Sequence, residues 1–171
     1  MAEPVPIISF IGPHNVGKTT ILEKVIPHLT ARGIKVGVVK HAHRNPDLGS
    51  DSKDSARLFN AGAVTVVVSS ADRVFTYRRL AREMDISEIH AEIAGDLDLV
   101  IAEGYKKEAW PKIEVLRREV ATEPLQVNNL VAMVSDFTLE NSRVPVFDVE
   151  DVDGIAAFIV ERFLDGTEGE K

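Results

Sequence analysis

Hydrophobic and polar positions alternate along the chain in short blocks that predict strands followed by helices. Continuous apolar runs rich in β-branched residues predict buried strands, and apolar positions three and four residues apart predict helices. The expected strands span residues 6–11, 35–39, 64–69, 73–78, 97–102, 112–117, 130–134 and 144–147. The expected helices span residues 19–32, 54–61, 86–94 and 152–164. This order indicates an α/β fold with a mostly parallel sheet and helices on both faces.

The polar stretch from residue 41 to residue 53 predicts a loop, and no other composition shift divides the chain. We therefore expect a single nucleotide-binding domain over residues 1–164, followed by a flexible tail over residues 165–171. No apolar run is long enough to span a bilayer, and the start MAEPVPII lacks the basic residues of a signal peptide. These features favour a cytoplasmic location and no membrane partner.

Charge and cysteine content narrow the classes of function. The net charge of −7 repels a phosphate backbone, so we expect no nucleic-acid partner of the basic-patch type. A small anionic ligand is still compatible, because one pocket can be positive in a negative protein. The chain contains no cysteine, which excludes disulfides, thiolate catalysis and cysteine-ligated zinc.

The segment ISFIGPHNVGKTT contains the pattern G-x-x-x-x-G-K-[ST] between a predicted strand and a predicted helix. Glycines allow the loop to turn tightly, and its N–H groups with the following helix N-terminus form an anion cage. Lys18 is expected to reach the β- and γ-phosphates, and the Thr19 hydroxyl to bind Mg²⁺. The candidate nucleotide-binding residues are Gly12, Pro13, His14, Asn15, Val16, Gly17, Lys18, Thr19 and Thr20.

A metal-bound triphosphate also needs an acidic side chain nearby. Asp98 and Glu103 bracket the predicted strand DLDLVIAEG, and ligands of open α/β sheets lie at the carboxyl ends of strands. This rule favours Glu103, which would hold Mg²⁺ through water or orient an attacking water. Lys18 and Glu103 are therefore the candidate catalytic residues, with a solvated loop carboxylate as the alternative for Glu103.

The polar loop after the second strand is expected at the same edge of the sheet. Its acids Asp47 and Asp51 are candidates to complete the metal shell beside Thr19 and Glu103. Its cations are candidates for a second anionic ligand, and a plain solvated loop is the competing interpretation. These weaker candidates are Lys40, His41, His43 and Lys53.

The stretch LVAMVSD ends a predicted strand with Asp136. A carboxylate there would accept two hydrogen bonds from guanine, from N1–H and from the 2-amino group, which adenine does not offer. A cap on a helix or turn is the competing role for this side chain.

Five stretches, in order, resemble the molybdopterin-guanine dinucleotide biosynthesis protein B (MobB) family: GPHNVGKTT, VVKHAH, KDSARLFNAGA, DLVIAEGYK and PKIEVLR. The resemblance covers roughly residues 7–136. It implies a three-layer phosphate-loop NTPase-like fold, a homodimer, and weak GTP hydrolysis with Mg²⁺. It also implies an accessory role in molybdenum cofactor biosynthesis. The partners would be a molybdopterin-type ligand and the MobA-like guanylyltransferase that joins GMP to molybdopterin.

Carried onto this chain, the resemblance identifies residues 12–20 as the phosphate loop, Glu103-Gly104 as an acidic switch-like end and Asp136 as the guanine contact. The chain departs from the family pattern before Lys53, because Gly49 stands where many members carry an acid. Asp47 or Asp51 is expected to substitute for that acid.

Two other functions remain open from the sequence. A small-molecule kinase of the phosphate-loop class would need an arginine-rich lid, for which the run YRRLAR over residues 77–82 is a candidate. A charged edge or interface is the favoured interpretation of that run. A nucleotide-gated adaptor without turnover would use GTP only to set a loop conformation.

Overall fold

The computed structural model describes residues 4–42 and 53–165. Contacts between residues divide the chain into two compact units, Met1–His41 with Ile89–Lys171, and Ala42–Glu88. The first unit carries the phosphate loop and the second is an insertion between two strands of the main sheet. None of the described helices is long and apolar enough to cross a bilayer.

The first unit is built on a six-stranded sheet in which every neighbouring pair is parallel. The strand order is β2-β5-β1-β6-β7-β8. The strands are β1 (Ile7–Ile11), β2 (Val36–Lys40), β5 (Leu99–Glu103), β6 (Lys112–Leu116), β7 (Leu130–Ser135) and β8 (Val146–Asp148). The predicted mostly parallel α/β sheet is confirmed, and its central strands are buried and mostly apolar, as the pattern indicated.

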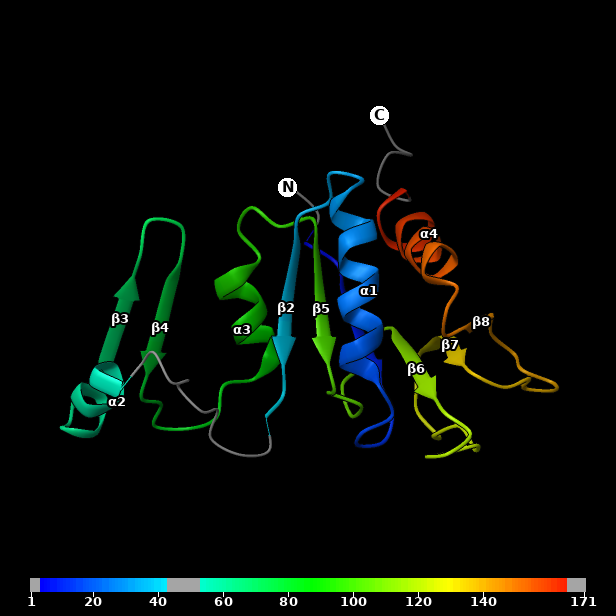
Figure 1. Ribbon diagram of the computed structural model, residues 1–171, viewed down its shortest axis with the longest axis horizontal. Coiled ribbons are helices and arrows are strands. Elements are labelled where there is room, and N and C mark those ends of the chain that lie inside the picture. Colours follow the sequence, from blue (N-terminus) through cyan, green and yellow to red (C-terminus); the bar gives the residue numbers. More distant parts are fainter. Residues whose placement is uncertain (1–3, 43–52, 166–171) are drawn as a thin grey trace. The chain divides into compact units, whose positions relative to one another are not determined.

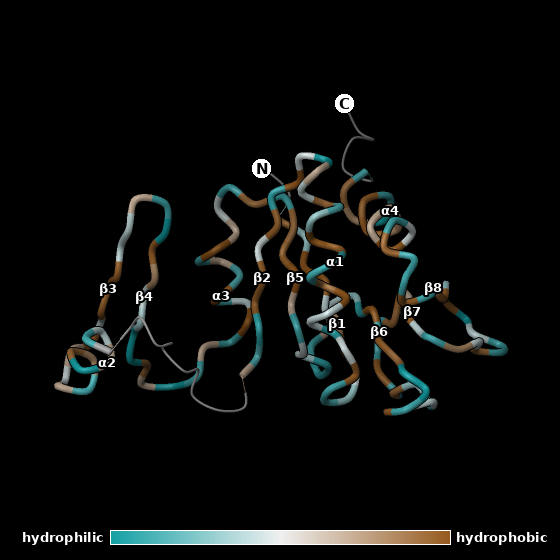
Figure 2. The backbone as a smooth tube through the Cα atoms, in the orientation of Figure 1, coloured by the Kyte–Doolittle hydropathy of each residue, from teal (hydrophilic) through white to brown (hydrophobic). Residues whose placement is uncertain are grey.

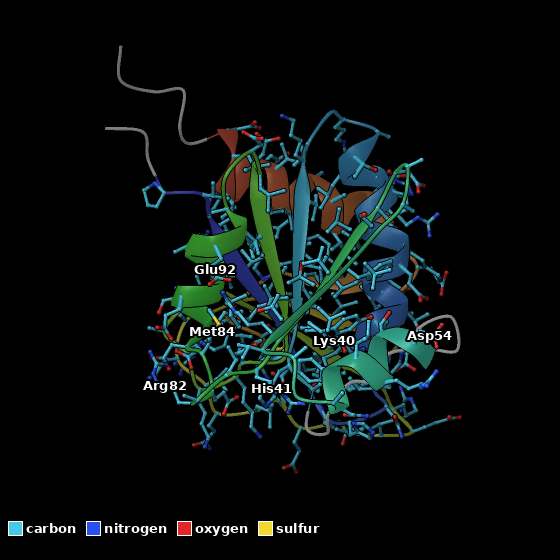
Figure 3. The ribbon with its side chains drawn as sticks, turned by 90° about the vertical axis from the view of Figure 1, so that its left-hand side faces the viewer. Lys40, His41, Asp54, Arg82, Met84 and Glu92 are labelled. Atoms are coloured by element: carbon cyan, nitrogen blue, oxygen red, sulfur yellow. The ribbon has the colours of Figure 1, made fainter. Side chains whose placement is uncertain are left out.

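Helices cover both faces of this sheet. Helices α1 (Lys18–Thr30) and α4 (Val152–Phe163) pack together on one face, where Val36 joins their apolar cluster. The next residue, Gly37, faces the other side, where a Cβ would lie 3.7 Å from Ile93 of helix α3 (Ile86–Ile93). Successive strand residues point to opposite faces, so α3 and α1 flank opposite faces of the sheet, as Figure 3 shows.

The core forms because the apolar stripe of each helix meets the apolar strands. Leu22, Val25 and Leu29 of α1 lie one helical turn apart and pack with Phe10 and Ile101 in one buried cluster. Figure 2 shows hydrophobic positions concentrated along β5 and β6. Burying a side chain of this size contributes roughly 1.5–3 kcal/mol to folding, which fixes the strands that carry the site.

The second unit contains helix α2 (Lys53–Asn60) and an antiparallel hairpin of β3 (Thr65–Ser69) and β4 (Val74–Arg78). The apolar run VTVVVS predicted a strand, but this strand pairs only within its own hairpin and not with the main sheet. Its side chains are largely exposed within the described residues, including Val67 at 59% and Phe75 of β4 at 53%.

Parallel pairing brings the strand ends together at one edge of the sheet. Figure 1 shows β2, β5 and β6 running to the same lower edge, where the phosphate loop also follows β1. Four polar residues therefore lie at this edge, each at the last position of a strand or just after it: Lys40, Glu103, Arg117 and Asp136.

Strand β6 carries two fully buried residues with ionisable side chains, Lys112 and Glu114. Lys112 donates hydrogen bonds from its ammonium to the backbone carbonyls of Glu108, Trp110 and Asn128. Glu114 accepts one from Leu125 N–H through Oε1, whereas its Oε2 has no partner among the described residues. Burial raises the pKa of the Glu114 carboxyl, because the charged form is poorly solvated there.

We expect Glu114→Gln to stabilise the protein at neutral pH. The folded pKa of Glu114 is raised above its unfolded value, so the penalty of ionising it is absent below the unfolded pKa, about 4.3. The penalty appears as pH rises through the folded pKa. The variant should therefore unfold at higher urea than the wild type at pH 7.5 and at the same urea near pH 4.

The exposed Glu119→Gln is the matched control for this measurement, since it removes the same charge without burial. An increase in stability that is equal at both pH values would contradict the assignment to Glu114 ionisation.

Candidate functional site

The phosphate loop turns between β1 and α1 on residues with positive φ. These are Gly12 at 141°, Asn15 at 60° and Gly17 at 94°. A Cβ on Gly12 would lie 2.5 Å from the carbonyl oxygen of Val115, so only glycine fits at that point. Val16 is 1% exposed and anchors the loop in the core. The strand-loop-helix context that the motif requires is therefore present.

Lys18 begins α1 and its side chain lies back along the loop. Its Nζ donates to the carbonyls of Gly12 at 3.1 Å and Pro13 at 2.8 Å. Burial lowers the pKa of the Lys18 ammonium, while the charge of Glu103 acts in the opposite direction. The ammonium is thus held inside the loop curve, where a phosphate oxygen would compete with two carbonyls for it.

Thr19, Glu103 and Lys40 meet beside the loop. The Thr19 hydroxyl lies 2.9 Å from both carboxylate oxygens of Glu103. The Lys40 ammonium lies 3.2 Å from Glu103 Oε1 and donates to Thr19 Oγ1 at 3.1 Å. The sequence made Lys40 a candidate to bind a second anionic ligand. In the structure it contacts Thr19 and Glu103, the two side chains predicted to bind the metal.

This pair of oxygen ligands is compatible with magnesium. Hydroxyl and carboxylate oxygens are the donors that Mg²⁺ prefers, and the contact with the Lys40 ammonium shows that positive charge is accommodated there. Glu103 is largely buried, with 11% of its side chain exposed, which strengthens its interaction with a cation.

The strand-end rule explains why Glu103 and not Asp98 is at the site. Glu103 pairs in register with Phe10 of β1 and Lys40 of β2, at the edge where the phosphate loop begins. Asp98 precedes the same strand at the opposite edge, where it accepts a hydrogen bond from the Lys35 N–H at 2.7 Å.

The remaining loop candidates are only partly described. His41 donates its backbone N–H to the Glu103 carbonyl at 3.2 Å, and its ring lies edge-on to Tyr105 with centroids 5.2 Å apart. Figure 3 labels Lys40 and His41 together at the carboxyl end of β2. His43, Asp47 and Asp51 lie outside the described residues, as does the side chain of Lys53. Over the described ranges, no three His, Asp or Glu side chains cluster as a metal site.

Asp136 follows β7 and its carboxylate already has partners in the protein. Oδ1 accepts the Arg118 backbone N–H at 2.8 Å, and Oδ2 lies 3.9 Å from Nη1 of Arg117. Asp136 therefore joins the end of β7 to the residues just after β6. Its contact with guanine stays a prediction.

Arg117 is the residue that the sequence interpretation overlooked. It directly follows the last residue of β6, and its Nε and Nη2 lie 3.7 Å from the position of a Cβ on Gly17. The strand-end rule that selected Glu103 and Asp136 applies equally to Arg117, so the signal was present in the motif PKIEVLR.

The arginines of the proposed kinase lid have partners within the second unit. Arg79 donates to the carbonyls of Ala63 and Phe59 and stacks over the Phe59 ring at 4.2 Å. Arg82 makes a two-pronged ion pair with Glu88 at 2.6 and 2.8 Å. These bonds favour the interpretation of this run as a structural charged edge.

Sequence and structural comparisons agree with one another. The family model described as Molybdopterin guanine dinucleotide synthesis protein B (MobB) matches residues 7–136. The molybdopterin-guanine dinucleotide biosynthesis adapter protein of Escherichia coli (strain K12) is 36% identical, over 92% of this chain and 93% of that protein. The protein of the same description from Haemophilus influenzae is 35% identical, over 93% of this chain and 90% of its own. A crystal structure of molybdopterin-guanine biosynthesis protein B has a TM-score of 0.74 at 29% identity, covering 91% of this chain and 98% of that one.

Proposed function

The chain belongs to the molybdopterin guanine dinucleotide synthesis protein B (MobB) family, and from this premise we propose that it is a GTP-binding accessory protein. Its role lies in molybdenum cofactor biosynthesis, in which its relatives are named as adapter proteins. GTP and Mg²⁺ are its ligands in this proposal, and its partner is the enzyme that attaches GMP to molybdopterin.

The observation that carries the proposal is the geometry around the phosphate loop. Lys18 is held in the curve of the loop by two carbonyls, and the Thr19 hydroxyl contacts Glu103. The loop contains residues with positive φ, and it leads into the N-terminus of α1. Its backbone N–H groups and the helix dipole favour a bound anion. One site thus combines an anion cage with two oxygen ligands for a cation.

In this proposal each residue has a defined task. The loop from Gly12 to Thr20 binds the phosphates, and Lys18 neutralises their charge. Thr19 and Glu103 hold Mg²⁺, which when bound offsets the charge of the β- and γ-phosphates. In the alternative role, Glu103 would accept a hydrogen bond from the attacking water and orient it for slow hydrolysis.

Calorimetric titration tests the ligand directly. We expect GTP with Mg²⁺ to bind and ATP with Mg²⁺ to bind at least about tenfold more weakly, a difference of about 1.4 kcal/mol. Equal affinities would overturn the assignment of guanine and leave a general triphosphate site. No affinity for either nucleotide would overturn the proposed function as a whole.

A nucleotide-gated adaptor without turnover is the second candidate, and the description of the relatives as adapter proteins favours it. Here GTP acts only by binding one loop conformation better than another. This candidate predicts that the protein captures the guanylyltransferase only when GTP is bound, and captures the same amount when a non-hydrolysable GTP analogue replaces GTP. Capture that requires turnover would favour the hydrolysing form.

The hairpin of the second unit supports the proposed homodimer. An isolated two-stranded sheet is marginally stable in water, and this one exposes Val68 and Phe75, which lie directly opposite one another on the same face. A second copy of the chain would bury these side chains. We expect Phe75→Lys to shift the dimer to monomer in light scattering at micromolar concentration, because it places a charge in the buried interface.

Thr76→Lys is the matched control, since it adds the same charge to the neighbouring position on the opposite face of the hairpin. A Phe75→Lys protein with the wild-type mass would exclude this face from the interface. A monomeric wild type would overturn the homodimer.

A further inference from the structure

The end of β6 borders the phosphate loop on the side away from Glu103. In the strand order β5-β1-β6, the loop follows β1, Glu103 ends β5 on one side, and Arg117 follows β6 on the other. Val115 limits the space at Gly12, and Arg117 lies against Gly17. The loop is therefore flanked by an acid on one side and a guanidinium on the other.

The guanidinium of Arg117 faces the loop with the edge formed by its Nε and Nη2 nitrogens. Its Nε and Nη2 are both 3.7 Å from the position of a Cβ on Gly17, so this edge, and not the tip, lies beside the loop backbone. Neither nitrogen makes a hydrogen bond to any residue within 4–42 or 53–165. The Nε–Nη2 edge is the fork that matches two oxygens of a phosphate or carboxylate.

The Asp136 carboxylate lies near the same guanidinium, beside its Nη1 atom. Its Oδ2 lies 3.9 Å from Nη1, and its Oδ1 is fixed by the backbone N–H of Arg118 at 2.8 Å. The side chains of Arg117 and Asp136 are 28% and 30% exposed, so the pair is partly shielded from water. A partly shielded guanidinium whose Nε–Nη2 edge has no hydrogen-bond partner among the described residues is suited to bind two oxygens of a phosphate.

The position of the metal ligands decides which phosphate it meets. Thr19 and Glu103 mark the side of the loop where Mg²⁺ would be held, so the β- and γ-phosphates whose charge it would offset are expected on that side. The phosphate that leads to the nucleoside must lie on the opposite flank of the loop. That flank is the one that Arg117 occupies.

We propose that Arg117 binds the α-phosphate of the nucleotide through its Nε–Nη2 edge, and that Asp136 is a positioning residue that holds Arg117 for this contact. The inference rests on the proposed nucleotide binding and adds a ligand to the same site. It also gives Asp136 a role that operates through Arg117, in place of direct contact with the base.

Titration of paired arginine variants tests the contact. Arg117→Gln should weaken GTP and GDP by the same factor, roughly 10- to 100-fold, because both nucleotides carry the α-phosphate and charge-assisted hydrogen bonds are lost. Arg117→Lys should recover only part of that loss, since an ammonium keeps the charge without the fork. Arg118→Gln is the matched control, because the Arg118 guanidinium lies over the Phe137 ring at 5.3 Å.

The role of Asp136 is tested with a second nucleotide. Asp136→Asn should weaken GTP and GDP alike, and should add little further loss in the Arg117→Gln background, as for residues acting through one contact. It should leave the preference for GTP over XTP unchanged. A shift toward XTP would show that Asp136 pairs with the 2-amino group of guanine and would overturn its positioning role.

The outcomes separate this inference from the proposed function. If the wild-type protein binds no nucleotide, the proposed function is wrong. Wild-type protein that binds GTP, with Arg117→Gln no weaker than Arg118→Gln, removes only the inference. Loss confined to GTP, with GDP unaffected, would place Arg117 at the γ-phosphate and also overturn it. Thermal unfolding of each variant checks that the fold is intact, and Arg117→Lys carries the test should the glutamine variant unfold.

Discussion

Lys18→Ala is expected to abolish Mg²⁺-dependent GTP binding, with an affinity loss of at least about 100-fold. The ammonium lies within hydrogen-bond reach of two loop carbonyls, so it sits where the phosphates would lie in the loop. Without it, the charge of the β- and γ-phosphates would be offset by backbone dipoles and Mg²⁺ alone. Isothermal titration with GTP in the presence of magnesium measures the loss.

Lys24→Ala is the control for this prediction. Lys24 lies in the same helix, nearly two turns after Lys18, and its ammonium pairs with Glu150 at 2.8 Å on the surface. Exposed ion pairs of this kind contribute about 0–1 kcal/mol, so the control should bind GTP normally. Equal GTP affinity of the Lys18 and Lys24 variants would show that the loop does not bind the triphosphate.

Gly12→Ala is expected to destabilise the protein by about 3 kcal/mol or more and to impair the phosphate loop. Two independent costs add at this residue. Its φ of 141° is a conformation that side chains rarely adopt, and an added Cβ would lie 2.5 Å from the Val115 carbonyl oxygen. That oxygen belongs to backbone of a central strand, which has little freedom to move. Equilibrium unfolding in urea measures the change in free energy.

Two other glycines separate these costs. Gly33 has a φ of 83° but nothing within 4 Å of an added Cβ, so Gly33→Ala should cost only the backbone term, about 1–2 kcal/mol. Gly95 has neither a positive φ nor a neighbour within 4 Å, so Gly95→Ala should be nearly neutral. Should Gly12→Ala cost no more than Gly33→Ala, the close approach of β6 to the loop would be refuted.

Much of the fold was predictable because strong local signals agreed with one another. The apolar run before GPHNVGKTT becomes β1, the helical spacing after it becomes α1, and Glu103 lies at the expected strand end. VTVVVS shows the limit of this reasoning. Its apolar residues predicted a strand, but strand propensity does not specify a partner, and β3 pairs with β4 outside the main sheet.

The candidate site was predictable only as far as motif and strand position reach. Glu103 was chosen over Asp98 by the strand-end rule, and the two lie at opposite edges. The same rule applied to Arg117, but no residue spacing showed that β6 would pair beside β1. Lys40 likewise meets Thr19 and Glu103 only because β2 pairs with β5.

The amino-acid sequence by itself determined the elements, the parallel α/β class, the glycine-containing turn between β1 and α1, and the family, because these depend on periodicity and on residues close together in the chain. The tertiary structure alone decided strand order, and with it which side chains meet: Lys40 with Glu103, and Arg117 with Asp136 and Gly17. The physical reason is that these contacts join residues far apart in sequence through sheet pairing and packing, whose energies depend on the whole core and not on any local segment.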